Sequence, residues 1–166
     1  RADEEMGNRL TLNLVPTISL LDQVYKNWKR HAKVGFKSLV ICSDMDLQAK
    51  GSDQNPTSPQ DLSYLTHDKS KNINTFLDSF GDEKKVVFST YHSLPLVAKA
   101  LESSPSTFDL VIADEAHKTV SLKNKSKSSD NRFFTLVHDR EKIRAKKRLF
   151  MTATPRFVHD YIRKRV

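Results

Sequence analysis

The chain has 166 residues and a mass of 19.0 kDa, a size that suits one domain. Hydrophobic residues make up 37% of it, the mean hydropathy is -0.56, and no apolar run approaches the ~18 residues of a membrane span, so the composition excludes an integral membrane protein. The single cysteine, Cys42, excludes an internal disulfide framework and a thiolate zinc cage. Because no secretory leader is visible and the first residue is Arg1, we expect a cytoplasmic protein and a piece of a longer chain.

The formal net charge of +8 is unevenly distributed along the chain. Residues 1–117 carry 13 Lys and Arg against 16 Asp and Glu, whereas residues 118–166 carry 15 against 4. This asymmetry indicates that the second part faces a polyanion, usually nucleic acid, although a solvated basic surface would give the same pattern.

Short apolar runs bounded by polar or turn residues are typical of strands that are buried on both faces. In chain order they are Leu10–Val15, Ser38–Cys42, Val86–Ser89, Leu110–Ala113 and Arg148–Met151. Between them, helix-like stretches cover Ser19–His31, Asn72–Phe80, Leu94–Ser103 and Phe133–Ile143. This alternation predicts an α/β fold with an open, mainly parallel sheet and helices on both faces. Two polar stretches, Lys50–Leu62 and Lys123–Ser129, are predicted to be loops.

Ligands of such sheets bind beyond the carboxyl ends of the strands, so the residues that follow each predicted strand are the candidate functional residues. They are Pro16-Thr17, Ser43-Asp44, Thr90-Tyr91, Asp114-Glu115 and Thr152-Ala153-Thr154. These polar and acidic groups are expected to converge on one edge of the sheet.

The strongest single signal is an apolar strand that ends in Asp114-Glu115 and is followed by Ala116-His117. Two adjacent carboxylates can divide the work of phosphoryl transfer: one holds a hydrated Mg²⁺ and the other orients or deprotonates the attacking water. The simpler alternative is an acidic strand end before a helix N-terminus, where carboxylates favour the helix dipole.

The other strand ends carry weaker signals. The hydroxyls of Thr152 and Thr154 are separated by one small residue and can bond a neighbouring carboxylate or imidazole. Thr17 or Ser19 can cap the helix that follows Pro16, and the free amides of a helix start bind phosphate readily. Each of these patterns alone also fits an ordinary strand end or helix cap.

Taken together and in this order, the strand-end motifs resemble motifs Ia, Ib, II and III of superfamily 2 helicases and translocases of the DEAH-box type. The matching residues are Pro16-Thr17, Ser89-Thr90-Tyr91, Asp114-Glu115-Ala116-His117 and Thr152-Ala153-Thr154. The residues around these motifs are most similar to the motor part of restriction enzymes. The resemblance implies a RecA-like three-layer α/β sandwich with a mainly parallel sheet, of which residues 1–166 form an incomplete first ATP-binding domain.

The resemblance also implies roles for individual residues. Asp114 would hold the Mg²⁺ of MgATP, and Glu115 would activate the hydrolytic water. His117 would connect the nucleotide site to Thr152 and Thr154 and so couple hydrolysis to strand movement. The residues expected along the nucleic-acid backbone, most readily that of DNA, are Pro16, Thr17, Thr90 and Tyr91.

The sequence lacks two parts of a complete motor. No Gly-x-x-x-x-Gly-Lys-Ser/Thr phosphate loop occurs, and motifs IV to VI of a second RecA-like domain, the expected partner, are absent. We therefore expect that this chain alone does not hydrolyse ATP. The alternative function is a non-catalytic nucleic-acid-binding module with a helicase-like fold. A metal-dependent nuclease is less favoured, because Asp139, Glu141 and Lys142 do not form an Asp…Glu-x-Lys arrangement.

Overall fold

The computed structural model describes residues 7–42, 65–67, 70–79, 81–119 and 130–153. The predicted loops Lys50–Leu62 and Lys123–Ser129, the pair Ser43-Asp44, and Thr154 lie outside the described residues.

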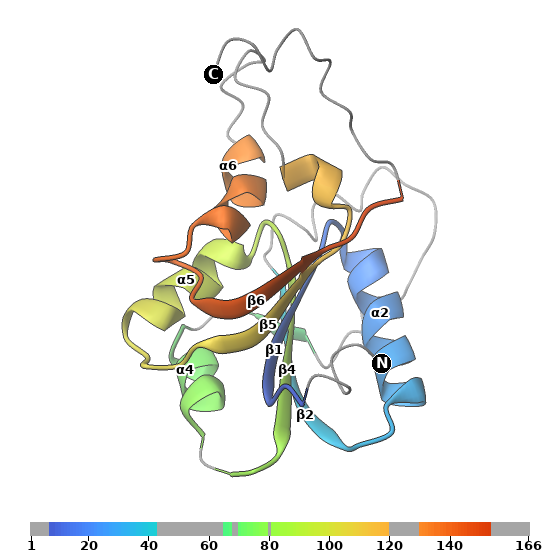
Figure 1. Ribbon diagram of the computed structural model, residues 1–166, viewed down its shortest axis with the longest axis vertical. Coiled ribbons are helices and arrows are strands. Elements are labelled where there is room, and N and C mark those ends of the chain that lie inside the picture. The colour runs from blue at the N-terminus through green and yellow to red at the C-terminus, as the bar shows by residue number, and fades with distance from the viewer. Residues whose placement is uncertain (1–6, 43–64, 68–69, 80, 120–129, 154–166) are drawn as a thin grey trace, which may run out of the picture.

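One sheet of parallel strands forms the centre of the described part (Figure 1). The strands are β1 (Leu10–Val15), β2 (Phe36–Cys42), β3 (Leu65–His67), β4 (Lys84–Thr90), β5 (Phe108–Ala113) and β6 (Ala145–Phe150). Their order across the sheet is β3-β2-β4-β1-β5-β6, and every neighbouring pair runs parallel. All six carboxyl ends therefore lie at one edge, as the sequence predicts for a site built from strand ends.

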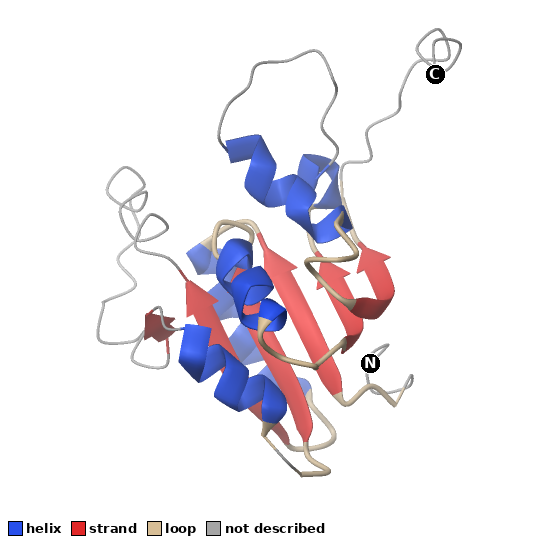
Figure 2. Ribbon diagram, turned by 90° about the vertical axis from the view of Figure 1, so that its left-hand side faces the viewer, coloured by secondary structure: helices blue, strands red, loops and turns tan. Residues whose placement is uncertain are grey.

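Helices cover both faces of this sheet. They are α2 (Ile18–His31), α4 (Ser70–Asp78), α5 (Leu94–Glu102) and α6 (Asp130–Thr135), with the short 3₁₀ helices η3 (Ala116–Thr119) and η4 (Leu136–His138). Helix α2 lies on one face and α4 and α5 lie on the other, where they stand in front of the sheet in Figure 2, which shows the left-hand side of Figure 1. This three-layer arrangement confirms the predicted RecA-like α/β fold.

The central strands are buried on both sides because a helix layer packs against each side of the sheet. All six residues of β1 are buried, so Thr11 and Asn13, which alternate with leucines along this strand, also lie inside the protein. On the α2 face, the Phe88 ring lies edge-on to Tyr25 and Trp28, at centroid distances of 5.5 and 5.6 Å. Cys42 belongs to the same cluster and has no exposed surface. The opposite cluster joins α4, α5 and η4 to the other side of the sheet.

Two predicted elements differ from the structure. The helix predicted over Phe133–Ile143 ends early, because the carboxylate of Asp139 accepts the backbone N–H groups of Glu141 and Lys142, both at 3.1 Å, and so forms a turn. Ile143 is fully buried without being helical, which accounts for the misleading apolar spacing. Strand β3 was not predicted at all, because three residues are too few to show a period.

Candidate functional site

Backbone hydrogen bonds tie the carboxyl ends of four strands into one edge. The Tyr91 N–H donates to the Val15 carbonyl (3.1 Å), and the Asp114 N–H donates to the Leu14 carbonyl (2.9 Å). Met151, just after β6, donates to the Ala113 carbonyl (2.9 Å) and accepts from the Ala116 N–H (2.8 Å). The turn that follows β5 is therefore hydrogen-bonded to the end of β1 on one side and to the residue after β6 on the other.

The turn after β5 places its two carboxylates in different environments. Glu115 is the only described residue other than glycine with positive φ, at 50°. Its N–H donates to the Asp114 Oδ1 atom (2.9 Å), and its carbonyl accepts the Lys118 N–H (2.9 Å) as η3 begins. The left-handed backbone turns the Glu115 side chain out of the strand direction, so the two acids do not simply alternate across the sheet.

His117 brings two of the predicted residues together. Its Nδ1 atom lies 3.0 Å from Glu115 Oε2 and 2.9 Å from Thr152 Oγ1. The imidazole is mostly buried, with 14% of its side chain exposed, whereas the Glu115 side chain is 32% exposed and Thr152 is exposed. A carboxylate, an imidazole and a hydroxyl from two strand ends thus form one connected group.

The Asp114 carboxylate suits a hydrated Mg²⁺. One oxygen accepts the Glu115 N–H, and among the described residues no donor is bonded to the other. Mg²⁺ keeps several waters and is usually held by one or two carboxylates together with substrate phosphates, so a single available carboxylate oxygen is sufficient. The part of the chain that the structure describes contains no group of three or more His, Cys, Asp or Glu that could enclose a metal ion.

Thr90 and Tyr91 lie inside the protein, in contrast to the expectation that they contact nucleic acid. Neither has exposed surface. The Thr90 hydroxyl bonds to Ser93 Oγ (3.0 Å), and the Tyr91 hydroxyl donates to the Asp114 carbonyl (2.7 Å). Burial, together with the nearby carboxylates of Asp114 and Glu115, raises the pKa of Tyr91 above its usual range, so this hydroxyl keeps its proton and remains a donor.

Pro16 and Thr17 occupy the corresponding turn after β1. Pro16 is buried, whereas Thr17 is exposed. The Thr17 hydroxyl accepts the Leu20 N–H (3.3 Å) and caps α2, so the simple capping interpretation holds for this residue. Of the four residues expected along nucleic acid, Thr17 alone has an exposed side chain.

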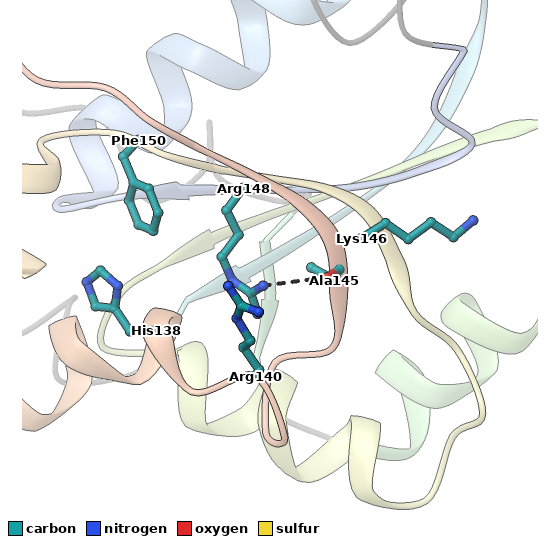
Figure 3. A pocket seen from close by; sticks show the side chains of 6 residues that line it. All are labelled: His138, Arg140, Ala145, Lys146, Arg148 and Phe150. Atoms are coloured by element: carbon teal, nitrogen blue, oxygen red, sulfur yellow. Dashed lines mark hydrogen bonds between the residues drawn. The ribbon is translucent and has the colours of Figure 1, made fainter.

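A basic pocket lies beside η4 and β6, and sequence analysis did not identify it (Figure 3). Its cavity volume is about 410 Å³, and its lining residues are His138, Arg140, Ala145, Lys146, Arg148 and Phe150. The His138 and Phe150 rings are stacked, with centroids 5.0 Å apart. The available signal was the run of cations from Lys142 to Arg148, but spacing alone does not show which of them share one face.

Among the described residues, neither guanidinium group of this pocket forms an ion pair with a carboxylate. Arg148 donates to the backbone carbonyls of Val137 (3.1 Å) and Ile143, and Arg140 forms no hydrogen bond or ion pair with the described residues. Burial, and then the nearby charge of Arg140, lowers the pKa of Arg148. Two neighbouring guanidinium groups that form no ion pair with the described residues favour the approach of an anion.

Comparisons with known proteins agree with this fold. A family model described as "Type III restriction enzyme, res subunit" matches residues 1–157. The chain is similar to the structure "ATP-dependent Type ISP restriction-modification enzyme LlaBIII bound to DNA", with a TM-score of 0.71 and 27% identity over 93% of this chain and 10% of that one. It is also similar to a nuclease-deletion mutant of the Type ISP enzyme LlaGI in complex with a DNA substrate mimic, with a TM-score of 0.64 and 27% identity over 91% of this chain and 11% of that one.

The matched region is a small part of each of these structures, since this chain spans about a tenth of their length. No curated protein sequence matches the chain. None of the helices in the described ranges combines the length and the apolar character needed to cross a membrane.

Proposed function

The chain belongs to the family of type III restriction enzyme res subunits, and from this premise we propose that it forms part of the ATP-binding domain of a DNA helicase or translocase. The observation that carries the proposal is the position of His117 Nδ1, within hydrogen-bond distance of both Glu115 and Thr152. A carboxylate that can accept a proton from water, joined through an imidazole to a hydroxyl beyond the next strand, suits an enzyme that links hydrolysis to movement.

Each residue of the site has a distinct role in this proposal. Asp114 would hold Mg²⁺, which supplies charge neutralisation at the phosphates of ATP. Glu115 orients the attacking water and accepts its proton, because its carboxylate is partly exposed and lies beyond the strand end. His117 holds the Glu115 carboxylate and, through Thr152, senses the position of β6. Thr154, two residues further on, is proposed to share the role of Thr152.

The proposed partners are DNA and a second RecA-like domain. Both similar structures are described as complexes with DNA or a DNA mimic. The described part of the chain supplies carboxylates but no phosphate-binding loop, so the ATP phosphates must be held by residues outside it. The 166-residue chain alone is therefore proposed to be inactive.

The decisive experiment measures DNA-stimulated phosphate release by the intact gene product. Glu115→Gln keeps the shape of the side chain and removes the base, so we expect a loss of about 10²- to 10⁴-fold in kcat. Glu102→Gln is the matched control, because Glu102 is exposed at the end of α5 and should leave the rate unchanged. Equal rates for wild type and Glu115→Gln would reject the assignment, and Glu115-dependent release by the 166-residue chain alone would reject its proposed inactivity.

The second candidate is a non-catalytic nucleic-acid-binding module, and the basic pocket favours it. Arg140→Gln should weaken binding of a duplex of arbitrary sequence and lower its salt dependence by about one phosphate contact. Lys147→Gln is the control, because Lys147 is an exposed cation on β6, beside the pocket, but does not line it. Arg140-dependent DNA binding without ATP hydrolysis by the intact product would establish the module instead of the motor.

A further inference from the structure

The Asp114–Glu115 peptide is fixed at both ends. Its carbonyl oxygen accepts the Tyr91 hydroxyl (2.7 Å), and its N–H donates to the Asp114 Oδ1 atom (2.9 Å). Because both bonds belong to one rigid plane, they set ψ of Asp114 and φ of Glu115 together. We propose that Tyr91 is a positioning residue, whose hydroxyl holds this peptide in the orientation that directs the Glu115 carboxylate to His117.

The position of Tyr91 in the fold suits this task. Tyr91 follows β4, whereas Asp114 follows β5, and β1 lies between these two strands. Neighbouring strands are about 4.8 Å apart, so the ends of β4 and β5 are roughly two strand spacings apart, and the Tyr91 side chain bridges them together with its 2.7 Å hydrogen bond. The Tyr91 N–H is bonded to the Val15 carbonyl at the end of β1 (3.1 Å), so the residue links the ends of three adjacent strands.

A helix that packs beside the sheet also contacts the Tyr91 ring. The ring packs against Phe134 of α6, with centroids 4.8 Å apart, and has no exposed surface. A fully buried phenol with a single hydrogen-bond direction can impose that direction on its acceptor, because the ring has no space in which to rotate away. The Tyr91 hydroxyl therefore donates to the Asp114 carbonyl from a fixed position.

The backbone of Glu115 needs such a constraint. A φ of 50° is uncommon and unfavourable for a residue with a long side chain, and such conformations persist only where the surroundings impose them. Without the Tyr91 hydroxyl, rotation of the Asp114–Glu115 peptide would return φ of Glu115 to negative values. The Glu115 Oε2 atom would then leave its 3.0 Å contact with His117 Nδ1.

The effect on catalysis rests on the proposed function, whereas the effect on the backbone does not. Tyr91→Phe removes one oxygen and preserves the ring that packs on Phe134. In the intact gene product we expect negative φ at Glu115, seen in a high-resolution structure of the variant. We also expect a fall in kcat of about 10- to 100-fold, with the KM for ATP within about twofold, because the base is misplaced rather than lost.

Tyr25→Phe is the matched control, because it removes a hydroxyl from the aromatic cluster on the opposite face of the sheet. It should leave φ of Glu115 and kcat unchanged. Replacement of Tyr91 by 4-aminophenylalanine restores an N–H donor at the same place and should restore both quantities; it also keeps the proposal testable if Tyr91→Phe does not fold.

Distinct outcomes separate the two proposals. Unchanged φ and kcat in Tyr91→Phe, or a lower melting temperature alone, would overturn the positioning role. Failure of 4-aminophenylalanine to restore φ, where the protein folds, would do the same. If the wild-type product shows no DNA-stimulated ATP hydrolysis, the proposed function fails, and the φ of Glu115 in the variant still decides the role of Tyr91.

Discussion

Strand β5 carries carboxylates at both ends, and the two ends serve different purposes. At its amino end, Asp109 accepts the backbone N–H groups of Arg9 (2.9 Å) and Leu10 (3.0 Å) and the Lys146 ammonium (2.7 Å). At its carboxyl end, Asp114 accepts one N–H, and Glu115 faces His117 across 3.0 Å. The first carboxylate is saturated with donors and fastens β1 and β6 to β5, whereas the second pair retains capacity for a ligand.

This contrast shows that the number of donors, rather than the residue type, separates a structural acid from a candidate catalytic one. Partial burial of Asp109 tends to raise its pKa, but the Lys146 ammonium and the two backbone N–H groups outweigh this and lower the pKa below its usual value. Substitutions at the two ends should therefore affect different measurements.

The largest expected effect is at the carboxyl end. Asp114→Asn removes the charge proposed to hold Mg²⁺ and should lower the kcat of the intact product by about 10²- to 10³-fold, because a metal ligand and its charge are lost together. The melting temperature should stay within a few degrees of wild type. A large fall in stability with unaltered kcat would place Asp114 in the same structural class as Asp109.

A smaller effect is expected at the hydroxyl that contacts His117. Thr152→Ala removes the 2.9 Å contact with Nδ1 but leaves the Glu115 contact in place. We expect the stimulation of ATP hydrolysis by DNA to fall about 5- to 10-fold, while the rate without DNA changes little, because one hydrogen bond is worth about 1 kcal/mol. Thr152→Ser keeps the hydroxyl and should behave as wild type. Equal losses with and without DNA would argue against a coupling role.

At the amino end the expected effect is on stability alone. Asp109→Asn keeps one acceptor oxygen but loses the charge opposite Lys146, so the free energy of unfolding should fall by about 1 kcal/mol in denaturant titrations. DNA-stimulated hydrolysis should be unaffected. Any specific loss of activity at constant stability would remove the distinction between the two ends of β5.

The smallest effect concerns pH. The folded-state pKa of Asp109 lies below its unfolded value, so its contribution to stability is complete above the unfolded pKa and is lost as the pH falls through the folded pKa. Wild type should therefore lose more stability than Asp109→Asn on acidification below about pH 4. Parallel curves of unfolding free energy against pH for the two proteins would contradict this.

The sequence predicted most of the fold because most of the parallel strands contain short, mainly apolar runs bounded by polar or turn residues. The predicted Leu10–Val15 agrees with β1 at both ends, since Arg9 and Pro16 bound the run. Strand β6 begins three residues before its prediction, because Lys146 and Lys147 are tolerated on a strand that pairs on one side only among the described residues. The pattern of residues also placed Glu115, His117 and Thr152 at one edge, where the structure joins them.

Side-chain direction at the strand ends could not be predicted in this way. Thr90 ends β4 and Tyr91 follows it at the expected edge, but a local pattern does not show whether a side chain there points to solvent or into the protein. The positive φ of Glu115 lies beside the hydrogen bond from Tyr91 to the Asp114 carbonyl, which joins segments 23 residues apart and is therefore not visible in a local pattern. The pocket depends likewise on η4 lying beside β6.

Because Cys42 is buried, the rate at which its thiol reacts can be used to measure local unfolding. This thiol is the only one in the chain, and it lies at the end of β2 with no exposed surface. A thiol-labelling reagent can react with it only after the α2 layer and the sheet have separated locally. Labelling rates would thus measure opening of that face directly, without an introduced probe, in every variant described above.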